Sequence, residues 1–175
     1  MLQTRAKPDT DTLSFRPPRA EDGPAIWQMI QASGALDTNS LYCNLLQCTD
    51  FAGTCVLAER AGAPMGWMSA YVPPARPGTL FVWQVCTAPE ARGQGLARRM
   101  IRSVLARPAC RDLRHVECTI TRANAPSWGL FRSLARELRA PIESELHFSR
   151  ETHLGGRHDS EMRVTIGPFQ TGDIQ

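Results

Sequence analysis

The stretch that most restricts the fold of this chain passes from an apolar segment through a proline and two glycines into an amphipathic segment. Residues 80–85, LFVWQV, are mostly β-branched or aromatic, which favours a strand. Residues 96–105 repeat apolar side chains at three- and four-residue steps, which is typical of one face of a helix. Pro89, Gly93 and Gly95 lie between the two segments. The sequence therefore predicts a strand that enters a helix through a glycine turn.

A helix that begins just after two glycines is suited to bind an anion. The first four backbone amides of a helix have no carbonyl partner within it, and they carry a partial positive charge. Gly93 and Gly95 lack a Cβ, so the backbone can approach a diphosphate closely. Arg92, Arg98 and Arg99 add formal charge nearby. Because the helix dipole contributes only about 0.3–2 kcal/mol, several amides and an arginine must share the binding of a coenzyme A pyrophosphate.

Other interpretations of this glycine turn make different demands on the sequence. A dinucleotide site needs a third glycine three residues after Gly95, where this chain has Arg98. A P-loop needs Gly-Lys-Ser/Thr after a longer loop, and neither Arg98 nor Arg99 is so placed. An ordinary helix N-terminus, in which glycine serves only for a tight turn, stays open on this segment alone.

Two motifs resemble those of the GCN5-related N-acetyltransferases, the GNAT superfamily. Arg92-x-x-Gly95-x-Ala97 is similar to its Arg/Gln-x-x-Gly-x-Gly/Ala signature, and residues 124–131, NAPSWGLF, are similar to its Asn-x-x-Ala/Ser-x-x-Leu-Tyr/Phe helix opening. The two motifs stand in the expected order, each on the expected kind of element. The resemblance implies an α/β fold with a mixed, mostly antiparallel sheet flanked by helices. Its motif-bearing central strands are expected to be parallel and to splay apart around acetyl-CoA.

The same resemblance implies how acetyl-CoA is held and where this chain departs from its relatives. Backbone groups near Val85 and Thr87 are expected to bond the pantetheine arm, and amides of residues 93–97 the pyrophosphate. Many relatives carry a tyrosine at position 131 that protonates the leaving thiolate, whereas Phe131 cannot donate a proton. A thiol titrates near about 8.5 and can leave as thiolate. The cofactor-binding residues implied are Val85, Cys86, Thr87, Arg92, Gly93, Gln94, Gly95, Leu96, Ala97, Asn124 and Phe131.

Further segments are similar to a narrower family, the L-2,4-diaminobutyrate acetyltransferases of ectoine biosynthesis. They are residues 36–46, 83–85 and 155–161, within a resemblance that covers about residues 14–166. This resemblance implies transfer of the acetyl group of acetyl-CoA to the 4-amino group of L-2,4-diaminobutyrate. Glu161, directly or through water, is expected to accept the proton, with Tyr42 as a second candidate catalytic residue. The substrate-binding residues implied are Asp37, Tyr42, Trp83, His158 and Glu161.

Each of these residues also has an ordinary structural interpretation. Asp37 could be the N-terminal residue that satisfies the amides of a helix over 41–48, and Tyr42 and Trp83 could be core aromatics. His158 and Glu161 could belong to a solvated loop. His153 and His158 lack a third ligand at suitable spacing, so we expect no metal. Two other functions stay open: acetylation of another small polyamine or a peptide amine, and, since Phe131 replaces tyrosine, a non-catalytic acyl-CoA sensor.

Length, charge and cysteine content are consistent with one cytoplasmic enzyme domain. We expect a flexible tail over 1–12, a single N-acetyltransferase domain over 13–169, and a second tail over 170–175. The net charge is +3, and the scattered arginines do not form a nucleic-acid surface. No membrane-spanning or signal-peptide run occurs, and the superfamily resemblance implies a homodimer. The six cysteines form no Cys-x-x-Cys, so we expect them to be small buried side chains.

Hydrophobic periodicity and turn residues predict the remaining elements. Pro24 and Gly34 are expected to mark the beginning and end of a first helix, and Pro126 the first turn of the last one. The polar segment 151–160 is expected to be a mobile loop. Strands are predicted near residues 13–16, 55–58, 65–71, 80–87, 116–120, 146–148 and 162–166, and helices near 23–33, 41–48, 96–107 and 126–138.

Overall fold

The computed structural model describes residues 12–34 and 36–170, and a seven-stranded sheet runs through it in the order β1-β2-β3-β4-β5-β7-β6. Within these residues every neighbouring pair is antiparallel except β4 and β5, which confirms the mixed, mostly antiparallel sheet. The predicted tails lie outside the described residues, apart from Thr12 and Gln170. The strands are β1 (Leu13–Arg16), β2 (Val56–Arg60), β3 (Ala63–Tyr71), β4 (Thr79–Thr87), β5 (His115–Thr121), β6 (Ile142–Phe148) and β7 (Glu161–Ile166).

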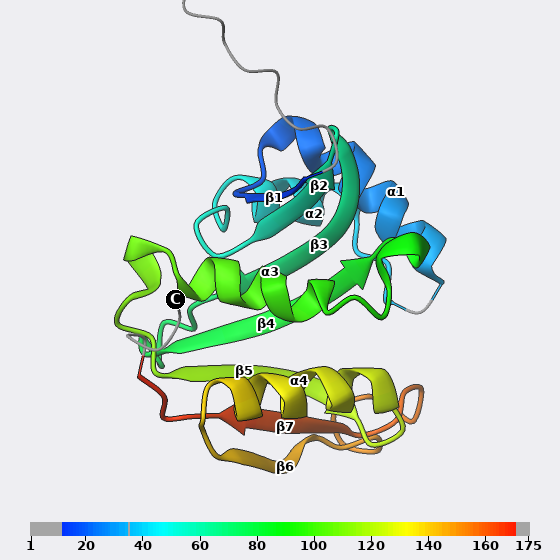
Figure 1. The fold of residues 1–175 in the computed structure, drawn as a ribbon. Helices are drawn as coiled ribbons and strands as arrows, with labels where there is room; N and C mark the ends of the chain where they lie inside the picture. Colours follow the sequence, from blue (N-terminus) through cyan, green and yellow to red (C-terminus); the bar gives the residue numbers. More distant parts are fainter. Residues whose placement is uncertain (1–11, 35, 171–175) are drawn as a thin grey trace, which may run out of the picture.

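Helices cover both faces of this sheet. Helices α3 and α4 lie in front of the central strands in Figure 1, whereas α1 and α2 lie behind the N-terminal half. Short 3₁₀ turns precede α1, precede the glycine turn and follow α3, at Ala20–Asp22, Pro89–Ala91 and Pro108–Cys110. Among the described residues no helix is long and apolar enough to cross a membrane. The helices are α1 (Gly23–Ser33), α2 (Leu41–Cys48), α3 (Leu96–Leu105) and α4 (Ala125–Glu137).

The helix ends follow from local side-chain chemistry. Ser40 caps α2, since its hydroxyl accepts a hydrogen bond from the Cys43 amide at 3.1 Å. Asn124 caps α4 in the same way, accepting from the Ser127 amide at 3.1 Å. Helix α1 ends at Gly34, whose φ of 62° lies in the left-handed region that glycine adopts readily. These caps place the helices at or near the predicted boundaries.

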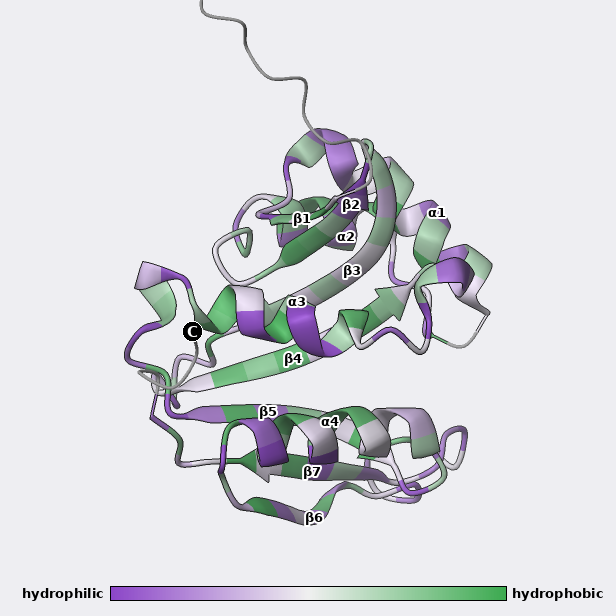
Figure 2. Ribbon diagram, in the orientation of Figure 1, coloured by the Kyte–Doolittle hydropathy of each residue, from purple (hydrophilic) through white to green (hydrophobic). Residues whose placement is uncertain are grey.

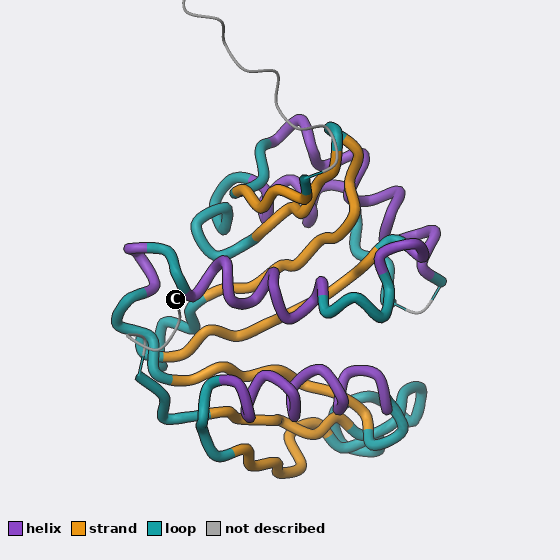
Figure 3. Tube along the Cα trace, viewed as in Figure 1, coloured by secondary structure: helices purple, strands orange, loops and turns teal. Residues whose placement is uncertain are grey.

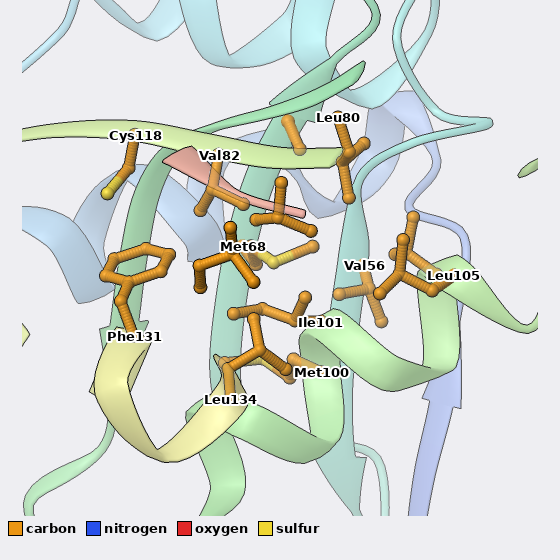
Figure 4. Close-up of a cluster of buried hydrophobic side chains, with 14 of the residues drawn as sticks. Val56, Met68, Leu80, Val82, Met100, Ile101, Leu105, Cys118, Phe131 and Leu134 are labelled. Atoms are coloured by element: carbon orange, nitrogen blue, oxygen red, sulfur yellow. The ribbon is translucent and has the colours of Figure 1, made fainter. Parts of the chain in front are cut away.

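The main core lies between the sheet and helices α3 and α4. Figure 4 shows Met100 and Ile101 of α3 and Leu134 of α4 packed toward the strands. A second, smaller cluster, which includes Ile26, Trp67 and Cys86, holds α1 against the other face. In Figure 2 the inner strands carry long hydrophobic stretches, while α3 alternates hydrophobic and hydrophilic bands. Burial of one apolar stripe per helix therefore fixes both helical layers on the sheet.

The parallel pair at the centre separates after a short contact. Strand β4 pairs with β5 at Thr79, Leu80 and Phe81, and within the described residues the pairing extends no further. The strands lie side by side at one end and diverge toward the other in Figure 1. This confirms the predicted splay of the two motif-bearing strands. The C-terminal half of β4, which leads into the glycine turn, is therefore not paired with β5.

A β-bulge in β4 alters which side chains face which layer. Ala70 of β3 pairs with Val82, but the preceding Ser69 pairs with Gln84, so Trp83 is an extra residue on β4. Val82 belongs to the main core and Val85 packs against it, whereas Cys86 belongs to the second cluster. Trp83 and Gln84 therefore both lie on the α1 and α2 face, although they are neighbours in sequence. The sequence did not indicate this bulge.

Two predicted elements differ in extent from the structure. Strand β6 begins at Ile142 rather than Leu146, and β2 and β3 turn tightly at Ala61–Gly62 rather than over residues 61–64. All six cysteines lie within the described residues and are free; five are buried, as predicted, whereas Cys43 is only partly buried. In the loop between β6 and β7, drawn as a tube in Figure 3, the Arg150 amide bonds the Ser160 hydroxyl at 2.9 Å. Its mobility stays a prediction.

Candidate active site

A cavity of about 1110 Å³ occupies the gap beside the diverging strands. Val85, Cys86 and Thr87 form one wall, and the turn from Ala91 to Arg98 forms the next. The N-terminal end of α4 closes the opposite side of the cavity, where the lining residues include the cap Asn124 and the first-turn residues Pro126 and Ser127. The cavity therefore extends from the central strand of the sheet to the N-terminal ends of two helices.

The N-terminus of α3 points free amides at this cavity. Gly95 is the N-cap of α3 and has no side chain, so it cannot bond the first-turn amides as Ser40 and Asn124 do in α2 and α4. Gly93 and Gly95 have φ values of 73° and 69°, which a residue with a Cβ adopts only under strain. The Gln94 side chain bonds the Glu90 carbonyl at 2.7 Å and closes the loop. These features suit the turn to bind an anion, and its assignment to the pyrophosphate stays a prediction.

Most predicted cofactor residues line the cavity, and the arginines divide between two environments. The lining includes Val85, Cys86, Thr87, Arg92, Gly93, Gln94, Gly95, Leu96, Ala97 and Asn124. Arg98 also lines it, held by an ion pair with Glu137 at 2.8 Å and a hydrogen bond to Ser133 at 2.8 Å. Arg99 instead lies over the Phe15 ring, 5.1 Å from its centroid. Of the three arginines expected to add charge, Arg92 and Arg98 are therefore at the cavity.

Phe131 lies in the hydrophobic core rather than among the cavity-lining residues. Its side chain is 3% exposed, and Figure 4 shows its ring extending from α4 toward Cys118 of β5. A tyrosine at this position would bury a hydroxyl that needs a hydrogen-bond partner, whereas the apolar ring of Phe131 needs none. The sequence motif alone could not distinguish this packing role from a position at the thiol end of the cofactor.

Several lining residues were missed by the sequence interpretation. Ser33 and Leu36 come from the end of α1 and the segment that follows it, and Leu130 and Ser133 come from one face of α4. Leu130 and Ser133 follow Ser127 at three-residue steps, so the helical period could have indicated them. Ser33 and Leu36 carried no such signal, because their approach to β4 depends on how α1 packs on the sheet.

Asp37 lies in the segment between α1 and α2, and it is not a helix cap. Ser40, three residues later, provides the cap of α2. The backbone carbonyl of Asp37 accepts a hydrogen bond from the Gln84 side chain at 2.8 Å, while its carboxylate side chain is exposed. The alternative interpretation of Asp37 as the residue that satisfies helix amides is therefore wrong.

Glu161 begins β7 in register with Thr121 of β5, at the end of the sheet where β4 and β5 diverge. Burial raises the pKa of its carboxyl, and the Asp37 charge raises it further. A hydrogen bond with Thr119 and the charge of His158 act in the opposite direction. Its Oε2 is buried without a hydrogen-bond partner in the described part of the chain. Asp37, His158 and Glu161, far apart in sequence, are thus close enough to interact electrostatically.

The two predicted substrate aromatics are exposed rather than in the core. Tyr42, in the first turn of α2, is 69% exposed, and Trp83 is 46% exposed with its ring 6.3 Å from that of Tyr71. His158 is exposed in the loop before β7. Among the described residues no three His, Cys, Asp or Glu side chains are grouped to hold a metal. Neither ring is among the cavity-lining residues, so within the described part of the chain each offers an exposed π face outside that lining.

Comparison with known proteins identifies the family. The model of the acetyltransferase (GNAT) family matches residues 24–135, which include the cavity and both motifs. The chain belongs to the GNAT acetyltransferase family. Within that family it is 46% identical over 164 residues to the L-2,4-diaminobutyric acid acetyltransferase of Chromohalobacter salexigens, covering 93% of this chain and 85% of the relative. It is 44% identical over 158 residues to the enzyme of that name from Methylotuvimicrobium alcaliphilum, covering 90% and 92%.

A solved GNAT structure extends the comparison to three dimensions. Diaminobutyrate acetyltransferase EctA from Paenibacillus lautus, in complex with its substrate L-2,4-diaminobutyric acid and coenzyme A, matches this structure with a TM-score of 0.86 at 37% identity. The match covers 91% of this chain and 96% of that one. The fold of this GNAT chain is therefore shared over nearly its whole length with an enzyme that binds both molecules.

Proposed function

We propose that this chain transfers the acetyl group of acetyl-CoA to the 4-amino group of L-2,4-diaminobutyrate, giving N4-acetyl-L-2,4-diaminobutyrate and CoA. The observation that carries the proposal is the near full-length similarity to the Paenibacillus lautus enzyme and to the curated relatives. The cavity at the diverging strands supports it, because its lining includes the α3 turn and two arginines that suit an acyl-coenzyme. By the resemblance of the sequence, the step belongs to ectoine biosynthesis, which protects cells against osmotic stress.

Acetyl-CoA suits the groups that line the cavity. The uncapped amides of α3, together with Arg92 and Arg98, provide positive charge for the pyrophosphate. The wall formed by Val85, Cys86 and Thr87 offers backbone groups to the pantetheine amides. We assign Asn124 to the thiol end of the cofactor, where it also lines the cavity. The resemblance assigns Phe131 to that end as well, although its ring packs in the core.

The reaction requires a neutral amine next to a polarised thioester. An alkyl amine titrates near about 10.4, so its neutral form at pH 7 is scarcer by about 4–5 kcal/mol. In our proposal the nitrogen attacks the thioester carbonyl, a backbone amide near Val85 stabilises the oxyanion, and the carbon–sulfur bond then breaks. The sulfur leaves as thiolate, which needs no acid from Phe131. Holding the two reactants together recovers about 7–11 kcal/mol of the barrier, so positioning is the larger contribution.

Glu161 accepts the proton of the attacking amine, directly or through water. Its raised pKa makes it a stronger base than an ordinary carboxylate, and its buried Oε2 has no other partner among the described residues. The negative charge of Asp37 adds to this basicity. Tyr42, exposed in the first turn of α2, is a second candidate to bond the amine as substrate closes the site.

A substrate with two ammonium groups suits the charges of this region. Asp37 and Glu161 each pair with one ammonium, and Trp83 faces a cation with an attraction of about 0.5–2 kcal/mol. His158, whose charge acts on Glu161, completes the substrate-binding set. Since the 2-amino group is the more acidic in solution, selection of the 4-amino group comes from the geometry of the site rather than from protonation.

We also propose that residues 13–169 act as one catalytic domain and that the enzyme is a cytoplasmic homodimer. Free, mostly buried cysteines suit a reducing compartment. Leu146, 57% exposed, and Phe148 lie on β6, which is the last strand in the sheet order and pairs only with β7 within the described chain. An exposed apolar edge of this kind favours pairing with a second copy. Light scattering at several protein concentrations measures the mass of the assembly, which is twice that of one chain for a homodimer.

Thiol release from acetyl-CoA by the purified protein tests the proposed function. The amines compared are L-2,4-diaminobutyrate, ornithine, lysine, spermidine and a peptide with a free N-terminus. We expect kcat/KM for diaminobutyrate to exceed that of every other amine. Preference for another amine contradicts the assigned substrate but keeps the cofactor site, and tight acetyl-CoA binding without release for any amine favours a sensor.

A further inference from the structure

The side chain of Gln84 joins the central strand to the segment that carries Asp37. Its Nε2 donates to the Asp37 carbonyl at 2.8 Å, and its Oε1 accepts from the Asn39 side-chain amide at 3.0 Å. Gln84 is 7% exposed, so both bonds form largely away from water. Both ends of this amide are thereby used on one short segment of chain.

The same segment is held from α1 as well. Trp27 donates its indole N–H to the Asn39 carbonyl at 3.1 Å. Residues 36–40 contain no helix or strand, so these side chains take the place of a regular backbone hydrogen-bond ladder. Leu36, just before Asp37, lines the cofactor cavity together with Val85. The segment therefore forms part of the site, and its position depends on two side chains that reach it from β4 and α1.

The β-bulge places Gln84 where this contact is possible. Without the extra residue at Trp83, regular alternation from Val82 would turn Gln84 toward the α3 and α4 face. With it, Gln84 faces Asp37 while Val85 still faces the cofactor cavity. Because of this one bulge, three consecutive residues of β4 differ in their surroundings. Trp83 is an exposed ring, Gln84 is the link to the segment of Asp37, and Val85 is part of the cavity wall.

We infer that Gln84 is a positioning residue for the diamine, which fixes the Asp37 segment to β4 next to the acetyl-CoA site. The inference rests on the proposed function and deepens it. In this assignment Gln84 has no contact with the reacting atoms. It acts through Asp37, because it sets the distance between the Asp37 carboxylate, which pairs with an ammonium group, and strand β4, which lies beside the thioester. Loss of the link lets the segment move and weakens diamine binding more than cofactor binding, because of residues 36–40 only Leu36 lines the cofactor cavity and the pyrophosphate amides lie on the α3 turn.

Steady-state kinetics of a Gln84→Met variant test this inference, because methionine keeps the shape of the side chain and removes both hydrogen bonds. We expect the KM for diaminobutyrate to rise about tenfold, since two hydrogen bonds are lost, while the KM for acetyl-CoA stays within about twofold. Asn39→Ala, in the segment itself, removes one of the bonds and is expected to raise the diamine KM about threefold. It provides the same readout if Gln84→Met fails to fold.

Two further variants separate positioning from a general loss of structure. Ser69→Ala alters the β3 residue that pairs with Gln84. Ser69 is buried, as Gln84 is, but among the described residues it does not bond the Asp37 segment. The diamine KM of this variant is expected to stay within about twofold of wild type. In an Asp37→Ala background, Gln84→Met should add less than about twofold to the diamine KM, because Gln84 acts through Asp37.

The outcomes distinguish this inference from the proposed function. Wild-type turnover with an unchanged diamine KM in Gln84→Met and Asn39→Ala overturns the inference alone. So does an equal rise in Ser69→Ala, an equal rise in both KM values, or full additivity with Asp37→Ala. Absence of wild-type turnover with diaminobutyrate overturns the proposed function, and this inference with it.

Discussion

Substitution of alanine for the two glycines of the α3 turn separates backbone strain from cofactor binding. Gly93 and Gly95 have φ values of 73° and 69° and line the cavity. A Cβ at Gly93 meets nothing within 4 Å, and one at Gly95 meets only the Arg98 side chain at 3.7 Å, among the described residues. Gly62, in the turn between β2 and β3, has a φ of 79° and equally open surroundings, but it is not part of the cavity lining. It is the matched control.

The structure sets the expected magnitudes. Because none of the three sites has a steric clash, each alanine should cost only the left-handed strain of about 1–2 kcal/mol. For a chain of this length that strain corresponds to a Tm lower by about 2–8 °C. At Gly93 and Gly95 the methyl group would also enter the proposed pyrophosphate site, because both residues line the cavity. Loss of one charge-assisted amide bond there weakens acetyl-CoA binding by about 1.5–3 kcal/mol, or about 10–150-fold.

Thermal unfolding and calorimetric titration of acetyl-CoA measure the two effects independently. All three variants should lose similar stability, and only Gly93→Ala and Gly95→Ala should lose affinity. Equal affinity in all three would refute the assignment of this turn to the pyrophosphate. A loss of affinity in Gly62→Ala as large as at the turn would show that strain anywhere in the chain weakens binding, and the assignment would again fail.

Three other predictions concern the base and the scaffold. Glu161→Gln should lower kcat by about 10²–10⁴-fold with unchanged acetyl-CoA affinity. In the wild type, the loss of activity toward acid pH should occur above the ordinary carboxyl pKa near about 4.3, because the pKa of Glu161 is raised. An unchanged pH profile in the variant removes Glu161 from the mechanism. The hydrogen bonds from Arg16 hold the pKa of Asp22 below its usual range, so Asp22→Asn should cost about 1.5–3 kcal/mol at pH 7. Since this stability is present above the unfolded pKa and is lost as the pH falls through the depressed one, urea unfolding should show the two proteins converging in acid. Arg107→Met breaks hydrogen bonds to three carbonyls of the loop before β2, and denaturation should show a loss of at least about 1.5–3 kcal/mol.

The fold could be predicted wherever periodicity and turn residues agree. The α3 turn, the prolines and glycine at the helix ends and the apolar central strands carry local signals, so their elements lie within a few residues of the predicted bounds. Strand β6 was not predicted in full: IESELHF alternates apolar and polar side chains, but Ser144 interrupts its apolar side and most of the strand is exposed at the edge of the sheet. Its pairing with β7 determines where it begins, and a single sequence does not show that pairing.

The site could be predicted in part, for a similar physical reason. Residues that act through backbone and helix ends, such as Gly93 and Gly95, are contiguous, so a motif indicates them. The proximity of Asp37 and Glu161 depends on sheet order and was available only through family resemblance. The role that we infer for Gln84 depends on a bulge that no local sequence pattern indicates. Contacts between segments that are far apart in the sequence could not be predicted from this chain's sequence alone.

The most direct measurement of the central claim is the position of the acetyl group in the product formed from acetyl-CoA and L-2,4-diaminobutyrate, determined by NMR. The account predicts a single product, acetylated on N4, together with one equivalent of free CoA thiol. Acetylation on N2, the amine that is neutral more often in solution, or a mixture of the two products, would contradict the claim that Asp37, Trp83 and Glu161 present the 4-amino group to the thioester.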